Sequence, residues 1–251
     1  MLKRRIIAHR GHSAGAPEQT MEAFERAVAL GAEIIEADVQ LSRDGVLVLM
    51  HDETLDRTTS GQGPVIAMDW ADIARLDAGS WFSPAFAGAR VPALEELFAF
   101  AEQNGISLCL EAKEQAGVEK GRVAQRVADR IARRGRLALD IVNAFDHGVL
   151  AAAAAAVPGL RLAPDRNPEH GPSSAAALIA QARALGATVI EHHFADLTPE
   201  IVAAVQSEGI EIWAWAPLTR IETKRAFDTG AIGIMGDDVA AIAELAEEER
   251  R

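Results

Sequence analysis

Several short apolar runs in this sequence carry, or end in, side chains that could do chemistry. The first run ends in His9, the second carries Glu36 and Asp38, and a later run carries Glu111. Glu36 and Asp38 are two residues apart, so on a strand both point to the same face. Buried carboxylates without partners are costly, which predicts that the three acids converge on a cation. Because only oxygen ligands are offered, we expect Mg²⁺ or Ca²⁺ rather than zinc.

A predicted hairpin brings a second histidine to the same place. Asp44-Gly45 stands between two apolar runs, which is a strong short-range signal for a β-hairpin. With the turn there, any register places His51 opposite a residue between Glu36 and Asp38. Imidazoles change charge near pH 6.5, so one of His9 and His51 can accept a proton while the other donates one. This predicts general acid-base catalysis.

The formal charges of the site indicate its substrate. Three carboxylates and a dication sum to −1, a phosphodiester makes −2, and Arg10 with Lys113 brings the sum to zero. A guanidinium fork and an ammonium point charge both suit phosphate oxygens. We therefore expect a small phosphodiester held by Arg10 and Lys113.

The composition narrows the class of partner. The chain has 37 acidic and 25 basic residues, a net charge of −12, which repels nucleic acid and anionic membranes. It contains no run of eighteen apolar residues, and Ile6-Ile7-Ala8 is too short for the apolar part of a signal sequence, so we expect a cytoplasmic protein without stable membrane insertion. We also expect a monomer or a homodimer. Cys109 is the single cysteine, and its apolar neighbours predict a buried, inert thiol.

Short apolar strands and amphipathic helices alternate along the chain, and most of the candidate residues lie within or at the ends of these strands. This alternation predicts a (β/α)8 TIM barrel as one domain over residues 1–251, with an open doubly wound sheet as the lesser alternative. TIM-barrel enzymes place their reacting groups at the carboxyl ends of the strands. The predicted strands cover 6–8, 33–39, 107–112, 139–142, 160–163, 188–191, 210–215 and 232–235. The predicted helices cover 20–30, 94–103, 118–133, 147–156, 173–185, 199–207 and 220–228, followed by a helical tail.

Residues 52–92 interrupt this alternation. They are rich in Gly, Trp and Phe and show neither helix nor strand periodicity. A loop of this length is unusual unless it is functional, so we interpret 52–92 as an inserted subdomain over the barrel mouth.

The order and spacing of these motifs resemble the glycerophosphodiester phosphodiesterase family. The similar segments are His9-Arg10-Gly11, Pro17-Glu18-Gln19-Thr20, 36–45, His51-Asp52, 76–82, 91–96 and Glu111-Ala112-Lys113. The resemblance implies a TIM barrel with an insertion after His51. It also implies that Glu36, Asp38 and Glu111 bind the metal, that His9 and His51 are the acid-base pair, and that Arg10 and Lys113 hold the phosphoryl oxygens.

The resemblance further implies an activity, the hydrolysis of glycerophosphodiesters such as glycerophosphocholine to glycerol 3-phosphate and an alcohol. The neighbouring glycerol hydroxyl would attack to give a cyclic phosphate, which water then opens. The sequence departs from the family pattern at Gln19, a mild change in a capping position, and around Asn143 and Asp237, which affects the alcohol side. We expect Trp215, near the end of its strand, to line the pocket or to contact a choline-like cation.

Two other functions are compatible with the same barrel. One is a lysophospholipase D-type phosphodiesterase that acts on lipid diesters, which the lack of a basic amphipathic helix disfavours. The other is a non-catalytic phosphate-binding barrel. The presence of His9 and His51 beside three acids disfavours it, because binding alone needs no proton-transfer pair.

Overall fold

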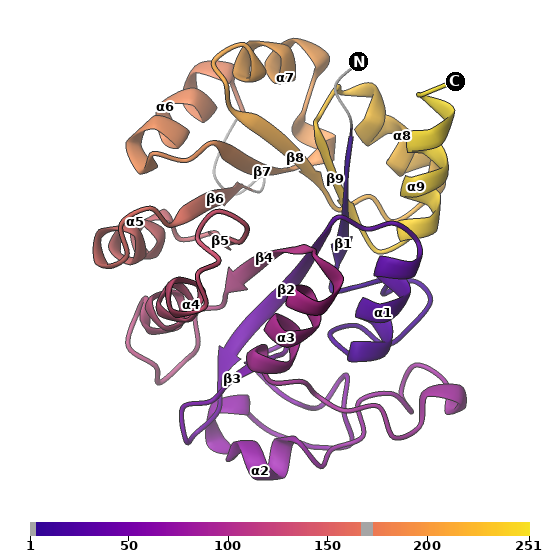
Figure 1. The fold of residues 1–251 in the computed structure, drawn as a ribbon, viewed down its shortest axis with the longest axis vertical. Coiled ribbons are helices and arrows are strands. Elements are labelled where there is room, and N and C mark those ends of the chain that lie inside the picture. Colours follow the sequence, from indigo (N-terminus) through magenta and orange to yellow (C-terminus); the bar gives the residue numbers. More distant parts are fainter. Residues whose placement is uncertain (1–3, 167–172) are drawn as a thin grey trace.

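The computed structural model describes residues 4–166 and 173–251 and confirms the predicted (β/α)8 barrel (Figure 1). Its parallel strands follow the order β1-β9-β8-β7-β6-β5-β4-β2, and β1 pairs with β2 to close the ring. The barrel strands are β1 (Arg5–His9), β2 (Ile34–Leu41), β4 (Ser107–Ala112), β5 (Ile141–Ala144), β6 (Arg161–Arg166), β7 (Val189–His193), β8 (Glu211–Trp215) and β9 (Gly233–Gly236).

Helices between the strands cover the outside of the barrel (Figure 1). Their caps explain where several of them begin: the side chains of Thr20, Thr198 and Thr219, among others, accept a hydrogen bond from the first helical turn. The helices of the barrel are α1 (Met21–Ala29), α3 (Leu94–Asn104), α4 (Arg122–Arg133), α5 (His147–Ala156), α6 (Ala175–Leu185), α7 (Pro199–Gln206), α8 (Arg220–Asp228) and α9 (Val239–Glu248). Within the two described ranges, no helix combines the length and apolar character needed to cross a bilayer.

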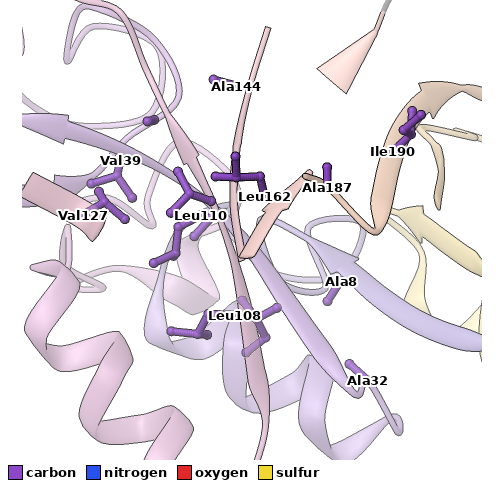
Figure 2. Close-up of a cluster of buried hydrophobic side chains, with 14 of the residues drawn as sticks. Ala8, Ala32, Val39, Leu108, Leu110, Val127, Ala144, Leu162, Ala187 and Ile190 are labelled. Atoms are coloured by element: carbon purple, nitrogen blue, oxygen red, sulfur yellow. The ribbon is translucent and has the colours of Figure 1, made fainter. Parts of the chain in front are cut away.

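The main hydrophobic core lies between the outer faces of the strands and these helices. Val127 of α4 packs in the same cluster as Val39 of β2 and Leu110 of β4 (Figure 2). Burial of each such side chain contributes about 1.5–3 kcal/mol, so the core holds the strand ends at fixed positions.

The inside of the barrel is layered. A lower layer is apolar and consists of Ile7, Ile34, Cys109, Ile141, Ala163, Val189, Trp213 and Met235. Side chains two residues apart on a strand share a face, so the residue two positions further along each strand also points inward. Those residues are His9, Glu36, Glu111, Asn143, Asp165, Glu191, Trp215 and Asp237. The apolar layer therefore forms the floor under a ring of mostly polar side chains.

The predicted hairpin is also present. Strand β3 (Leu47–Leu49) runs antiparallel to the end of β2, with Val39 opposite Leu49. Gly45 in the turn has a φ of 81°, a left-handed conformation that favours glycine. The N–H of Met50 donates to the carbonyl of Asp38 at 3.1 Å, which places His51 at the level between Glu36 and Asp38.

Residues 52–92 contain more regular structure than their sequence predicts. They form η1 (Val65–Ala67), α2 (Trp70–Ile73) and η2 (Pro84–Phe86), which are too short to give a periodic pattern. Their apolar side chains pack into a cluster of their own with the β3 arm, made up of Val48, Met50, Leu55, Val65, Ile73, Ala78 and Val91. The assignment of 52–92 as a separate subdomain over the barrel mouth stays a prediction.

Some predicted boundaries are wrong by a few residues. The strand predicted at 139–142 begins at Ile141, because Leu139 and Asp140 belong to the preceding turn, where both N–H groups donate to the carbonyl of Arg136. The helix predicted from residue 118 begins at Arg122, because Gly117 and Gly121 adopt positive φ angles before it. The strand predicted at 160–163 continues to Arg166 and so includes Asp165.

Candidate functional site

Three carboxylates meet at the carboxyl ends of β2 and β4. Asp38 and Glu111 are paired across the two strands, and Glu36 lies two residues before Asp38 on the same face. One oxygen from each of the three side chains lies within 4.8 Å of the others. The sequence predicts this convergence, and the parallel register of β2 and β4 produces it.

The electrostatics of the three acids call for a cation. Burial and the charge of Asp38 hold the pKa of Glu36 well above its usual range. Burial and the same charge raise the pKa of Glu111 to about 7, although Lys113 opposes this rise. Burial also opposes ionisation of Asp38, but Lys113 and Arg10 outweigh it and lower the pKa of Asp38. Two cations thus favour the ionised form of Asp38, while burial and the charge of Asp38 favour the protonated forms of Glu36 and Glu111, whose protons a metal ion would displace.

The donor set fits a hard divalent cation. Oxygen ligands alone are available from the three acids, as Mg²⁺ and Ca²⁺ prefer. Asp38 Oδ1 is buried and accepts no hydrogen bond, although Lys113 Nζ lies 3.3 Å from it in an ion pair. A buried carboxylate oxygen in this situation has capacity for a metal ligand bond.

Arg10 and Lys113 lie beside the acids as predicted. Arg10 Nε is 3.1 Å from Asp38 Oδ2, and Lys113 Nζ is 2.9 Å from Glu111 Oε1. Arg10 has a φ of 57° and Gly11 a φ of 83°, so the chain makes a tight left-handed turn directly after β1. A Cβ on Gly11 would lie 2.7 Å from the backbone of Ala23, so only glycine fits there.

Gln19 differs from its expected capping role. The N-cap of α1 is Thr20, whose hydroxyl accepts from Ala23 N. The Gln19 amide instead donates to Asp38 Oδ2 at 2.6 Å, which fixes the carboxylate of a candidate metal ligand. The sequence before α1 did not predict the contact between Gln19 and Asp38. It depends on the left-handed backbone conformation of Gln19, which has a φ of 59°.

Each candidate catalytic histidine is held by a carboxylate. His9 Nδ1 lies 2.6 Å from Asp237 Oδ1, and His51 Nδ1 lies 2.6 Å from Asp52 Oδ1. Both histidines line the same cavity as Glu36, Glu111 and Lys113. With Nδ1 donating to the carboxylate, Nε2 of each ring is the nitrogen available to a substrate. Burial lowers the pKa of His51, with the positive charges of Arg10 and Lys113 adding to this effect, although Asp38 and Asp52 oppose it.

A chain of ion pairs links His51 to Arg10. Arg57 donates to Asp52 Oδ2 at 2.6 Å and to both oxygens of Glu18 at 2.8 Å. Glu18 Oε1 also accepts from Arg10 Nη1 at 3.2 Å. The Arg57 hydrogen bond is the main reason that the pKa of Asp52 falls to about 2. Sequence reasoning gave no role to Arg57, which lies in the irregular 52–92 segment.

The remainder of the cavity is formed by β5 to β8. Its lining includes Asn143, Phe145, Asp165, Glu191 and Trp215. The Trp215 indole N–H donates to Asp165 Oδ1 at 2.6 Å, and the Asn143 amide donates to Glu191 Oε2 at 3.0 Å. Burial, with the charges of Glu191 and Glu111, holds the pKa of Asp165 well above its usual range.

Glu191 has a second partner below it. The Cys109 thiol, fully buried as expected, donates to Glu191 Oε1 at 2.9 Å. Burial raises the pKa of Glu191 to about 8. Sequence reasoning assigned no function to Asp165 or Glu191, and it linked Asn143 to the alcohol side only as a departure from the family pattern. Each of these three residues lies two positions after an inward-facing apolar residue on its own strand, and this spacing could have identified them as residues that line the cavity.

A family model and a relative of known sequence both match this chain over most of its length. Residues 9–241 match the model of the glycerophosphoryl diester phosphodiesterase family. A glycerophosphodiester phosphodiesterase of Caldanaerobacter subterraneus is 32% identical over 247 residues, covering 97% of this chain and 98% of that protein.

Two solved structures share the fold over nearly the whole chain. A glycerophosphodiester phosphodiesterase from Agrobacterium tumefaciens is 29% identical with a TM-score of 0.81, covering 96% of this chain and 99% of that one. A phosphodiesterase from Oleispira antarctica, solved in complex with the product sn-glycerol-3-phosphate, is 25% identical with a TM-score of 0.86. That match covers 97% of this chain and 96% of the other.

Proposed function

Because this chain belongs to the glycerophosphoryl diester phosphodiesterase family and is a glycerophosphodiester phosphodiesterase, we propose that it hydrolyses its substrates with a divalent cation and two histidines. The products are glycerol 3-phosphate and an alcohol. The observation that carries the proposal is one cavity lined by His9, His51 and acids of the three-carboxylate cluster. The product bound to the Oleispira antarctica neighbour supports the same reaction.

The proposed metal ligands are Glu36, Asp38 and Glu111. A divalent cation there, Mg²⁺ or Ca²⁺, would supply positive charge to the phosphoryl oxygens. Arg10 and Lys113 would bind the remaining phosphoryl charge, since both already lie within about 3 Å of the carboxylates. With three carboxylates, a dication, two basic side chains and a phosphodiester, the formal charge of the loaded site is zero.

The two imidazoles would transfer the protons. We assign His51 as the first base, because burial and the positive charges of Arg10 and Lys113 lower its pKa and so favour the neutral ring. His51 Nε2 takes the proton of the glycerol hydroxyl next to the phosphodiester, and that oxygen forms the new P–O bond. The P–O bond to the alcohol breaks, and His9 Nε2 gives its proton to the departing oxygen. The Asp237 carboxylate, 2.6 Å from His9 Nδ1, holds this ring in place.

The second step reverses these roles. His9 Nε2 takes a proton from water, whose oxygen attacks the cyclic phosphate. His51 Nε2 returns its proton to the glycerol oxygen as the ring opens to glycerol 3-phosphate. Both rings finish in their starting protonation states, so no other proton donor or acceptor is required.

A panel of diesters tests this proposal against its alternatives. Glycerophosphocholine and lysophosphatidylcholine are incubated with Mg²⁺ or Ca²⁺, and the released alcohol and glycerol 3-phosphate are measured. We expect turnover of the water-soluble diester, and its loss after exhaustive EDTA treatment. Turnover of lysophosphatidylcholine at least comparable with that of glycerophosphocholine would support the lysophospholipase D-type alternative. No turnover of any diester would support a phosphate-binding barrel. The cytoplasmic location and the monomeric or dimeric state remain predictions.

A further inference from the structure

One buried side chain outside the cavity contacts the backbone that carries His51. Gln40 is fully buried near the end of β2, and its amide nitrogen lies within hydrogen-bonding distance of the carbonyl oxygens of residues 50–52. We propose that Gln40 is a positioning residue, which holds the bend that directs His51 toward the substrate. This inference rests on the proposed function and adds a residue to the machinery of that reaction.

Gln40 lies on the same face of β2 as the candidate metal ligands. It is two residues beyond Asp38, so the two side chains point to the same face. In the hairpin it pairs with Val48, and the chain then returns through Met50 to His51. Among the described residues that line the cavity, His51 is present and Gln40 is absent. Gln40 would therefore act through His51 rather than on the substrate.

Three backbone carbonyls converge on the amide nitrogen of Gln40. Gln40 Nε2 donates to the carbonyl oxygens of Met50 at 2.8 Å and of Asp52 at 2.6 Å. The carbonyl oxygen of His51 lies 3.2 Å from the same nitrogen. Carbonyl oxygens that point at one place repel one another, whereas an amide nitrogen offers two N–H donors. The amide therefore stabilises a backbone conformation that the carbonyls alone would disfavour.

This bend allows His51 to contact the next residue in the chain. Successive side chains point to opposite faces of an extended strand, so neighbours on a strand do not meet. The chain instead bends at residues 51–53, and His51 Nδ1 lies 2.6 Å from Asp52 Oδ1. This contact leaves Nε2 as the ring nitrogen that is available to the substrate. By holding the bend, Gln40 sets the direction of the nitrogen that transfers the proton.

The oxygen of the Gln40 amide supports a dedicated role. Oε1 is buried, and no described residue donates a hydrogen bond to it. A buried acceptor without a donor costs free energy. The amide cannot reverse to satisfy this oxygen, because the carbonyl oxygens of residues 50–52 have no hydrogen to donate. The side chain is thus fixed in the one orientation that serves the backbone around His51.

The test removes the donor and keeps the length of the side chain. Gln40→Met has a similar reach and no N–H group, so the three carbonyls lose their partner. We expect kcat to fall by about tenfold to hundredfold, because a misdirected imidazole transfers protons poorly. KM should change little, because Arg10 and Lys113 are untouched. The rise in melting temperature on addition of Mg²⁺ should persist, because the three acids are untouched as well.

Proton NMR gives a readout that a general loss of stability would not change. The short hydrogen bond from His51 Nδ1 to Asp52 gives a downfield proton resonance, which is assigned by its absence in His51→Ala. We expect this resonance to shift or disappear in Gln40→Met. Gln115→Met is the matched control, because the Gln115 amide is also buried and bonds to the backbone of β2, at Leu41. It should lower the melting temperature and leave the resonance in place.

Two further measurements do not depend on Gln40→Met. Gln40→Asn keeps an amide but is one methylene shorter, so it should lose part of the contact and show the same changes to a smaller degree. In the wild-type enzyme, the side-chain amide protons of Gln40 should exchange slowly with water, because they are buried and hydrogen-bonded.

The outcomes distinguish this inference from the proposed function. An unchanged kcat or an unshifted His51 resonance in Gln40→Met would each overturn the positioning role, and so would rapid exchange of the Gln40 amide in the wild-type enzyme. Loss of the Mg²⁺-dependent melting shift in that variant would also overturn it, because Gln40 would then act through the metal ligands. Failure of the wild-type enzyme to hydrolyse any diester would instead refute the proposed function. Loss of the His51 resonance in Gln40→Met would still support the positioning of His51 in that case.

Discussion

Addition of Mg²⁺ or Ca²⁺ to the metal-free enzyme should raise its melting temperature, and the rise should be larger at higher pH. One carboxylate oxygen from each of Glu36, Asp38 and Glu111 lies within 4.8 Å of the others, and Glu36 and Asp38 are buried. Burial and the charge of Asp38 raise the pKa of Glu111 to about 7, so this side chain keeps a proton that a cation must displace. Binding is therefore coupled to proton release.

The structure sets the size and sign of the effect. The pKa of Glu111 rises from an ordinary 4.5 to about 7, and this shift contributes on the order of 3 kcal/mol to the free energy of unfolding when the side chain is protonated. The folded state binds this proton more tightly than the unfolded chain. The metal-free enzyme therefore loses that stability as the pH rises from about 4.5 to about 7. A cation at about 100 times its Kd restores about 2.7 kcal/mol, or roughly 5 to 10 °C for a chain of this size.

The assay is a melting curve with and without cation, measured near pH 6 and near pH 8 on protein dialysed against EDTA. Titration calorimetry in parallel measures the Kd and the protons released. Glu111→Gln should abolish most of the rise and flatten its pH dependence. Glu119→Gln changes an exposed glutamate a short distance along the chain and serves as the matched control.

Two results would refute this reasoning. A melting temperature that does not respond to either cation would show that the three acids do not bind a metal. A rise of equal size at both pH values would show that Glu111 is already ionised in the metal-free enzyme.

Three further predictions concern catalysis, positioning and the core. His9→Ala and His51→Ala should each lower kcat by about 10²- to 10⁴-fold while leaving the cation-dependent melting shift intact, and an unchanged kcat would exclude the acid-base assignment. Arg57→Gln should reduce kcat/KM with little change in melting temperature, because its exposed ion pairs add little stability but hold Asp52 and Glu18. Arg43→Gln, which removes a more exposed bidentate pair with Asp69, is its control, and equal activity of the two variants would contradict a positioning role. Phe98→Ala should cost about 3–5 kcal/mol in denaturant unfolding, since the ring is fully buried, and a loss below about 1 kcal/mol would contradict its place in the core.

The sequence was sufficient to predict the barrel and one side of the cavity. Each of Glu36, Asp38 and Glu111 interrupts an otherwise apolar strand. Burying an unpaired carboxylate is energetically costly, so these acids indicate a functional site. The hairpin at Asp44-Gly45 predicted that His51 lies opposite a residue between Glu36 and Asp38, because residues on two paired strands face one another in a fixed register.

The opposite side could not be predicted in the same way. Pro164 ends the apolar run before Asp165, so the strand was expected to stop early, although Pro164 is buried within β6. Glu191 was placed at a strand end, where an acid is ordinarily solvated. Arg57 contacts Asp52 and Glu18 through the folding of an irregular segment, for which sequence spacing carries no information.

The position of the candidate catalytic residue His51 depends on the surface turn between β2 and β3. His51 reaches the cavity because the chain reverses at Gly45 and returns with Leu49 opposite Val39. Side chains alternate along this arm, so a single residue inserted into the turn would exchange inward and outward positions on the way back. His51 would then point out of the barrel, while every residue of the barrel itself stayed in place. The length of a solvent-exposed turn is thus as tightly constrained as the identity of a buried acid, and a homologue with a longer turn there would need a compensating deletion before its histidine.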